Sequence, residues 1–143
     1  MPPARVDPYR NFNFLVEIDG IAQTGFREVI LPEATADVIE YREGHEPSAV
    51  RKLKGRVRLG NLILRWGATG SRDLYDWWRR VQDGAADRRT ISVILLDDDR
   101  TPVKRWNFRA AWPVRYEISA LDAAGHEVLI ETLEVAHEGM ELA

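Results

Sequence analysis

The feature that most constrains the fold is one amphipathic helix in a chain that otherwise has the patterns of strands. Its apolar side chains recur at the spacing of a single helix face: Leu74, Trp77, Trp78 and Val81. This spacing predicts a helix at about residues 71–83. Ser71 can cap its first turn, and Gly84 follows where helices commonly end. An aromatic stripe of this kind is far more often core than a ligand site, so we expect the four residues to pack on a sheet.

Outside this helix, short runs of alternating apolar and polar residues predict strands. Gly55 and Gly60 interrupt one long run and suggest bends or bulges. The sequence lacks the repeated strand–helix alternation of an open α/β sheet. We therefore expect a mainly β fold, a small β-barrel or sandwich of six to seven strands with one flanking helix. The expected strands cover residues 12–18, 26–31, 36–41, 51–66, 91–96, 103–112 and 127–137.

The length of the chain limits the number of domains. With 143 residues, the chain can bury one full core but not two of typical size. We expect an N-terminal arm at residues 1–10 and a single domain at residues 11–143. No stretch approaches the roughly 18 apolar residues of a membrane-spanning helix, so no membrane anchor is expected. The absence of cysteine excludes disulfides and thiolate metal sites and fits synthesis in a reducing compartment.

No residue pattern indicates catalysis or a bound cofactor. The three histidines have no recognised metal-binding spacing. Asp97, Asp98 and Asp99 lack the alternating ligands of a calcium loop and are better interpreted as a hairpin turn. Ser71 is not in the G-x-S-x-G pattern of a nucleophile elbow, because its neighbours are Gly70 and Arg72. The sequence therefore predicts a protein that is not an enzyme and has no cofactor or metal.

Charge is distributed unevenly along the chain. All 20 lysines and arginines precede residue 116, whereas seven of the 23 acidic residues follow it. Opposite charges on two parts of one surface favour head-to-tail contacts between copies, which close into rings or continue as filaments. Solubility alone explains the same counts about as well.

The strongest charged pattern is a basic segment in which Lys52, Lys54, Arg56 and Arg58 alternate with apolar residues or glycine. An extended strand with this pattern places all four cations on one side. Three interpretations fit: a protein partner, a nucleic acid, or a solvated edge that discourages strand pairing. No aromatic residue interleaves with the cations to stack bases, which disfavours nucleic acid.

A series of short segments, in order along the chain, carries a family resemblance. The segments are residues 7–12, 17–20, 39–44, 51–53, 60–67, 74–77, 95–97, 105–108, 111–113 and 131–139. Together they resemble the tail-tube protein family of T4-type contractile phages and related contractile injection systems. No single segment is specific, but the ordered series covers nearly all of residues 7–140.

The resemblance implies a tube-type β-barrel subunit that forms homohexameric rings, and the rings stack into a tube around a central lumen. The implied partners are further copies, a sheath protein, baseplate or spike proteins and tube-terminating proteins, with a payload in the lumen. Such a protein is made in the cytoplasm and assembled into a phage tail or injection particle. The alternative is a baseplate-proximal tube initiator that joins tube to spike. A ligand-binding or nucleic-acid-binding barrel is the less favoured interpretation.

The resemblance also gives candidates for contacts between subunits. Residues 42–60 resemble the extended loop or hairpin through which the family reaches a neighbouring subunit. Its cationic face would then meet carboxylates on another copy, and we take the acidic C-terminal strand as their source. The charged helix face is expected to lie near a neighbour. The candidate contact residues are Lys52, Lys54, Arg56, Arg58, Arg79, Arg80, Glu131, Glu134 and Glu138.

Overall fold

The computed structural model describes residues 7–23, 25–42, 44 and 50–143. Within these residues the chain forms ten strands and one helix. Residues 1–6 of the expected arm lie outside the described residues, as do residues 43 and 45–49 of the predicted hairpin. In chain order the elements are β1 (Phe14–Ile18), β2 (Ile21–Gln23), β3 (Phe26–Ile30), β4 (Ala34–Tyr41), β5 (Arg51–Leu59), β6 (Leu62–Gly67), α1 (Asp73–Gln82), β7 (Arg89–Leu96), β8 (Pro102–Ile118), β9 (Ile130–Ala136) and β10 (Gly139–Leu142).

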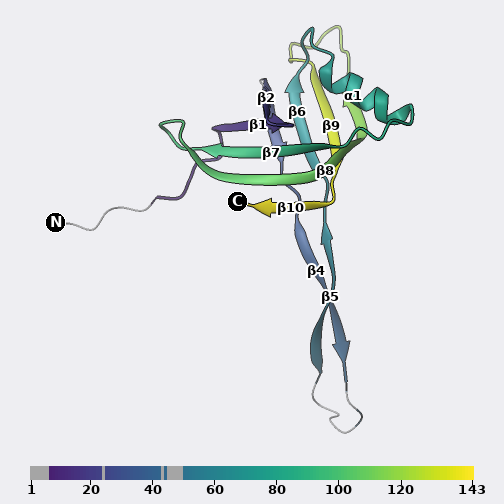
Figure 1. The fold of residues 1–143 in the computed structure, drawn as a ribbon. Helices are drawn as coiled ribbons and strands as arrows, with labels where there is room; N and C mark the ends of the chain where they lie inside the picture. Colours follow the sequence, from purple (N-terminus) through teal and green to yellow (C-terminus); the bar gives the residue numbers. More distant parts are fainter. Residues whose placement is uncertain (1–6, 24, 43, 45–49) are drawn as a thin grey trace, which may run out of the picture.

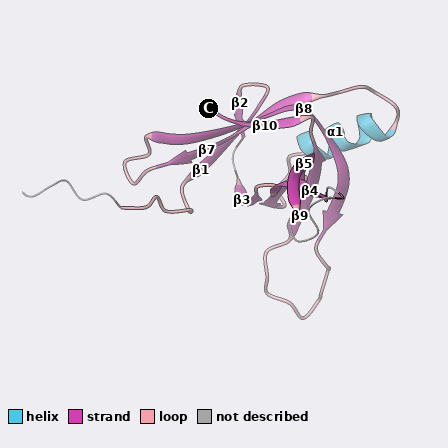
Figure 2. Ribbon diagram, turned by 90° about the horizontal axis from the view of Figure 1, so that it is seen from below, coloured by secondary structure: helices cyan, strands magenta, loops and turns pink. Residues whose placement is uncertain are grey.

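One antiparallel sheet makes up the body of the molecule, with strand order β2-β1-β7-β8-β9-β6-β3 and β10 added beside β8. Strands β4 and β5 form a separate two-stranded sheet. In Figure 1 the hairpin of β4 and β5 projects away from the body, while α1 lies at the opposite end. Figure 2 shows the same arrangement along the hairpin, with the long connection between β8 and β9 extending to one side. The mainly β fold with one helix is confirmed. The expected six to seven strands are too few, because the described residues form ten: β2 and β10 were not expected, and the expected run 51–66 is divided into β5 and β6.

The long strand β8 turns the sheet on itself. Its first part pairs with β7 and β10, and its second part, from Trp112 onward, pairs with β9. The change occurs at Ala110, which has a positive φ of 49°. There the register with β7 shifts, so Ala111 rather than Ala110 is buried. Such a bulge bends a strand and lets one strand serve two halves of a folded sheet.

The core lies between the two halves of the sheet and is closed by α1. Its buried side chains come from β1, β6, β7, β8, β9 and the helix: Val16, Ile18, Leu62, Leu64, Trp77, Ile91, Val93, Phe108, Ala111, Leu133 and Val135. Leu74, Trp78 and Val81 pack against this cluster, as their helical spacing predicted. The helix is therefore part of the core.

Strand β7 is buried on both faces, as its continuous apolar run predicted. Ile91 and Val93 face the core, and Ile94 is buried on the other side of the sheet. On that side an ion pair between Arg105 and Glu17 lies beside Ile94, with 3.5 Å between nitrogen and oxygen. The aliphatic stems of such long side chains cover apolar surface while their charged ends stay accessible. Part of the burial thus comes from charged neighbours on the same sheet.

Two local expectations for the helix differ from the structure. The helix begins at Asp73 rather than near Ser71, and its N-cap residue is Arg72, with no side-chain capping bond. Ser71 instead donates its backbone N–H to the Thr69 hydroxyl. The C-terminal expectation is confirmed, because Gly84 has a φ of +102°. Within the described residues, no helix has the length and apolar character needed to cross a membrane.

Candidate assembly surfaces

The β4–β5 hairpin is exposed on both of its faces. Val38, Ile39, Leu53 and Val57 are between 49% and 62% exposed, although all four are apolar. Each strand of the hairpin pairs only with the other. A two-stranded hairpin without a covering layer is marginally stable in water, and clustered exposed apolar side chains mark interaction surfaces. The hairpin is therefore the principal candidate for contact with another chain.

A bulge in β5 corrects the expected cationic face. Thr35 pairs with Arg58, and Ala36 pairs with Val57, but the register then shifts so that Val38 pairs with Lys54. Directly paired residues share a face. Lys52 and Lys54 therefore lie on one face and Arg58 on the other, because the extra residue in β5 reverses the alternation. Arg56 lies at the bulge, is exposed and has no directly paired residue in β4. Among the described residues of the hairpin, Lys52, Lys54 and Arg58 therefore do not form the continuous basic stripe on which the nucleic-acid interpretation depended.

The register defines two faces of the hairpin. Face one carries Ala34, Ala36, Val38, Glu40, Lys52, Lys54, Val57 and Leu59. Face two carries Thr35, Asp37, Ile39, Tyr41, Arg51, Leu53 and Arg58.

Two observations support this assignment of faces. Arg58 makes a two-pronged ion pair with Asp37, with nitrogen–oxygen distances of 3.1–3.2 Å, so these two side chains lie on the same side. A Cβ added to Gly55 would lie 3.0 Å from the Asp37 Cβ and 3.2 Å from the Ile39 Cγ1. A side chain at this position would crowd Asp37 and Ile39, so the bulge favours glycine.

The base of the hairpin is held to the body at Gly60. Its N–H donates to the Glu33 carbonyl at 3.1 Å, and its carbonyl accepts a bond from His137 Nε2 at 2.9 Å. The His137 ring also packs edge-on against Phe108, with 5.0 Å between ring centroids. His137 follows β9, so a residue distant in sequence fixes the direction of the hairpin. Sequence reasoning gave His137 no role, since its partner is a backbone carbonyl.

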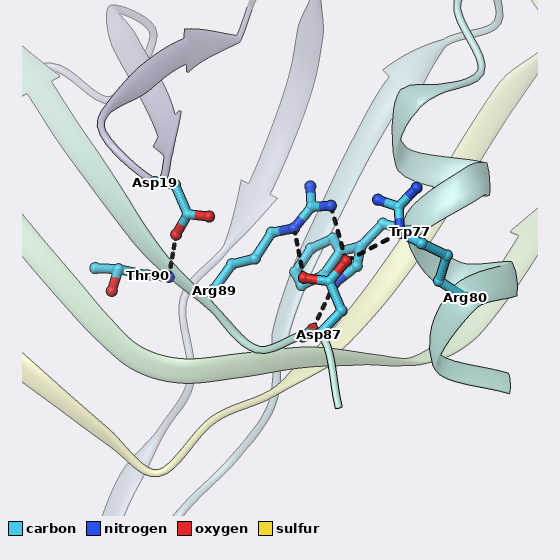
Figure 3. Close-up of polar contacts among 6 residues, drawn as sticks. All are labelled: Asp19, Trp77, Arg80, Asp87, Arg89 and Thr90. Atoms are coloured by element: carbon cyan, nitrogen blue, oxygen red, sulfur yellow. Dashed lines mark hydrogen bonds and ion pairs between the residues drawn. The ribbon is translucent and has the colours of Figure 1, made fainter. Parts of the chain in front are cut away.

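The helix is fastened to the sheet by a cluster around Asp87 (Figure 3). The buried Trp77 donates its indole Nε1–H to the Asp87 carbonyl at 2.8 Å. The Asp87 carboxylate accepts bonds from Arg89 at 3.0–3.1 Å and from Arg80 at 3.1 Å. The Arg89 guanidinium also lies 4.7 Å from the Trp77 ring centroid. These arginines, Arg89 first, hold the pKa of the Asp87 carboxyl below its usual value.

The two helix arginines predicted to contact a neighbour differ in their local partners. Arg79 forms a long ion pair with Asp83, 3.5 Å apart on the exposed helix surface. Arg80 is engaged with Asp87 in the cluster described above. Arg79 is therefore the more available of the two for an external partner. Their contact with another subunit stays a prediction.

The acidic residues chosen as partners for the cations already have partners within the subunit. Glu131 accepts hydrogen bonds from Trp66 Nε1 at 2.7 Å and from the Tyr116 hydroxyl. Glu138 pairs with Arg88 at 2.6 Å. Burial and the bond to Glu131 raise the pKa of Tyr116 to about 12, so this hydroxyl keeps its proton near neutral pH. Glu131 thus links β9 to its two neighbouring strands.

Glu134 is held in the same way. Asn61 donates to its carboxylate at 2.8 Å, and Arg115 donates at 3.1 Å. These bonds, the one from Asn61 first, lower the pKa of the Glu134 carboxyl. A contact between Glu134 and a cation of another copy would compete with these partners, and it stays a prediction.

An open apolar cleft, which sequence reasoning missed, lies between the segment before β1, strand β3 and the β7–β8 part of the sheet. Its volume is about 670 Å³. Phe12, which was expected inside the first strand, lies before it and is 59% exposed. Apolar residues dominate the lining: Tyr9, Phe12, Phe14, Val29, Ile30, Leu31, Val93, Leu95 and Trp106. No sequence pattern signals this cleft, because it depends on how three distant segments meet.

In the acidic turn between β7 and β8, a side chain of the turn accepts hydrogen bonds from the backbone N–H groups. Asp97 accepts hydrogen bonds from the N–H groups of Asp99 and Thr101 at 3.0 Å and 2.8 Å. The hairpin-turn interpretation is confirmed by the pairing of β7 with β8. In the described part of the chain, no three His, Asp or Glu side chains lie together in a way that could hold a metal ion.

A small β body with a hairpin exposed on both faces and an open apolar cleft defines a protein with surfaces suited to assembly. Comparison with known families gives the family. The model for the T4-like virus tail tube protein gp19 matches residues 10–141, and the chain belongs to this family. No curated protein matches the chain.

Solved structures share the fold along almost the whole chain. A chain in the cryo-EM structure of the anti-feeding prophage baseplate is 28% identical, with 97% of each chain covered and a TM-score of 0.87. A chain in the sheath–tube complex of an extracellular contractile injection system, PVC, is 23% identical, with 95% of this chain and 91% of that chain covered and a TM-score of 0.85. Hcp1 from Flavobacterium johnsoniae is 20% identical, with 92% and 94% covered and a TM-score of 0.57.

Proposed function

We propose that this tail tube protein forms rings of six copies, which stack into the inner tube of a contractile tail or injection particle. The observation that carries the proposal is the hairpin that leaves apolar side chains exposed on both faces, in a chain of the tail tube family. Exposed apolar side chains do not stabilise a monomer in water, whereas their burial against another chain is favourable. Stacked rings offer a neighbour for each face.

The proposed partners follow from the similar structures. One of these is described as a baseplate and another as a sheath–tube complex. We propose that this chain contacts a sheath protein on the outside of the tube and baseplate, spike and terminating proteins at its ends, and that a payload travels in the lumen. The chain would be made in the cytoplasm and act as a structural protein rather than an enzyme. Lys52 and Lys54 would contact carboxylates of another copy.

The alternative is a tube initiator at the junction between baseplate and tube. The observation that favours it is the similarity to a chain in the anti-feeding prophage baseplate, which has higher identity than the chain from the PVC sheath–tube complex. Both functions use rings of the same fold, so the fold does not separate them.

Stoichiometry separates the two functions. Particles would be isolated from the natural host, and the ratio of this chain to the sheath protein would be measured by quantitative mass spectrometry. A main tube subunit repeats with every ring of sheath and gives a ratio near one. An initiator occupies the base only and gives a ratio far below one. Absence of the chain from purified sheathed particles would contradict both functions.

A further inference from the structure

The open cleft between the segment before β1, strand β3 and strands β7 and β8 reaches down to the core. Val93 belongs to the buried core cluster, and Phe14, Val29 and Trp106 pack against that cluster where they line the cleft. The volume of about 670 Å³ lies in the usual range of binding clefts. Covering this apolar floor with another apolar group would be favourable.

The charged groups of the cleft are cationic where they are unpaired. Arg10 and Arg27 line the cleft, are exposed and form no ion pair with a described residue. Glu28 is the one acidic residue among the described residues of the lining, and its carboxylate is already paired with Arg65. Guanidinium groups bind carboxylates with two parallel hydrogen bonds. A matching occupant therefore presents an apolar side chain to the floor and carboxylates to the two arginines.

The long connection between β8 and β9, residues 119–129, has this combination of side chains, and we call it the β8–β9 loop. It projects from the body in Figure 2. Leu121 is 85% exposed, more than any other large apolar side chain in the described part of the chain. Asp122 and Glu127 are exposed and form no ion pair with a described residue. The loop contains no lysine or arginine, so its charge is opposite to that of the cleft.

Hydrogen bonds within the β8–β9 loop define its backbone. At the base, the Ser119 N–H donates to the Ile130 carbonyl at 2.8 Å, and the Ile130 N–H donates to the Ser119 hydroxyl at 2.9 Å. Beside the exposed leucine, the Asp122 carboxylate accepts the Ala124 N–H at 3.0 Å. The leucine is therefore presented by an ordered turn. A preformed element loses less conformational entropy when it binds.

From these two surfaces we infer that the β8–β9 loop of one copy inserts Leu121 into the cleft of a second copy, where its carboxylates pair with Arg10 and Arg27. The inference rests on the proposed function, because it takes the second copy to be a neighbour in the tube. Loop and cleft are different surfaces of one chain, so the contact is head to tail and can be repeated from copy to copy. Opposite charges give such a contact its register. The first six residues of the chain match the cleft less well, because they contain an arginine and no acidic residue.

Reciprocal site-directed crosslinking tests the inference. The chain has no cysteine, so Leu121→Cys and Ile30→Cys each place one benzophenone-maleimide label, on the loop and on the lining of the cleft. Each labelled chain would be assembled as a minority component with ¹⁵N-labelled wild-type chains, irradiated, and its adducts mapped by mass spectrometry. The same mixtures in urea serve as the unassembled control.

The inference predicts reciprocal capture between copies. The label at position 121 should capture ¹⁵N-labelled peptides from the lining of the cleft, residues 9–14 or 27–31, and the label at position 30 should capture ¹⁵N-labelled peptides from residues 119–129. Failure of either label to capture its expected segment of another copy above the urea control would overturn the inference.

The charge pairing is tested in the same assay. Arg27→Glu in the ¹⁵N-labelled chain should remove most of the capture by the label at position 121. Arg100→Glu makes the same change of charge at an exposed residue outside the cleft and should leave the capture unchanged. Equal capture by these two variants would overturn the pairing with the cleft arginines. Circular dichroism checks that both variants are folded.

Failure of the inference is distinguishable from failure of the proposed function. If wild-type chains form no rings, the proposed function is wrong. If rings form and the labels capture other surfaces, only the contact between loop and cleft is wrong.

Discussion

The indole Nε1 of Trp77 donates a 2.8 Å hydrogen bond to the carbonyl oxygen of Asp87, and this bond joins the middle of α1 to the segment that leads into β7. Trp77 has no exposed surface. A buried indole N–H needs a partner, and here a backbone carbonyl provides it whatever side chain stands at position 87. The contact therefore combines core packing with a fixed position for the helix.

Replacing Trp77 separates these two contributions. Trp77→Ala is expected to lower the free energy of unfolding by about 3–5 kcal/mol, because a large buried side chain leaves a cavity. Trp77→Phe keeps much of the packing but leaves the Asp87 carbonyl without its donor. This variant should lose less free energy of unfolding than the alanine variant, and the loss should include the roughly 1 kcal/mol that a hydrogen bond contributes. Urea unfolding followed by circular dichroism measures both. An alanine variant that loses less than the phenylalanine variant would contradict the core assignment.

Asp87 gives the body a predicted sensitivity to acid. Its pKa is lower in the folded chain than its ordinary value because of its bonds to Arg89 and Arg80. The stabilisation is therefore fully present above the unfolded pKa, about 3.9, and is lost as the pH falls through the lower folded pKa. Asp87→Asn should destabilise the protein at pH 7 by about 1.5–3 kcal/mol, the range for bonds to charged groups.

Urea unfolding of wild type and Asp87→Asn at a series of pH values checks this prediction. The gap between the two proteins should be constant around neutral pH and should narrow in acid. A gap that widens as the pH falls would contradict the assigned direction of the pKa. Asp98→Asn is the matched control, because that exposed carboxyl has no described partner.

The helix and most of the strands were predictable because their signals are local. The apolar spacing of Leu74, Trp77 and Val81 is a property of one segment, and so is the alternation within β1. The bulges were harder to predict. Ala110 has a positive φ without being glycine, and nothing in the sequence around it indicates the shift. Gly55 was recognised as a bend or bulge, but its effect on Lys52 and Arg58 depends on pairing with β4.

The candidate contact residues show the same limit. Sequence alone identified charged side chains but not their partners, because Glu134 meets Asn61 and Arg115 only after three strands have come together. The same is true of Arg80 and Asp87. Residue type therefore predicted a charged surface, while folding decided which charges remain available.

Charge reversal at Lys54 tests the cationic part of face one. Lys54→Glu, alone or with Lys52→Glu, is expected to abolish or strongly reduce ring formation, because it places a negative charge toward the carboxylates of another copy. Lys54→Glu alone should leave the stability of the monomer unchanged, because no ion pair joins Lys54 to a described residue. Lys52 lies directly opposite Glu40, so the added Lys52→Glu change places two carboxylates together and should lower the stability slightly. Sedimentation velocity measures assembly, and circular dichroism measures folding.

Lys104→Glu is the charge-matched control for Lys54→Glu. Lys104 is also an exposed strand lysine, but it lies on β8 rather than on the hairpin. Its reversal changes net charge by the same amount and should leave assembly intact. Normal rings from the Lys52 and Lys54 variants would refute the role of these lysines. An equal loss of rings in the Lys104 variant would show that assembly responds to net charge rather than to these positions.

Reversal of the two helix arginines is expected to have different effects on stability. Arg79→Glu replaces an exposed ion pair with Asp83 by two like charges one helical turn apart, in the last turn of the helix, and should cost about 1 kcal/mol. Arg80→Glu should cost more, because it places a carboxylate beside Asp87. If this helix face is shared with a neighbour, both variants will also reduce the yield of rings. Thermal unfolding and sedimentation velocity on the same samples separate the two effects.

Electron microscopy of the purified wild-type chain, over a range of concentrations and with baseplate proteins added to initiate polymerisation, tests the central claim most directly. The proposed function predicts rings with sixfold symmetry and a central lumen, which stack into tubes of uniform width. A chain that stays monomeric at high concentration, both alone and with those proteins, would contradict the claim that it is built to form a tube.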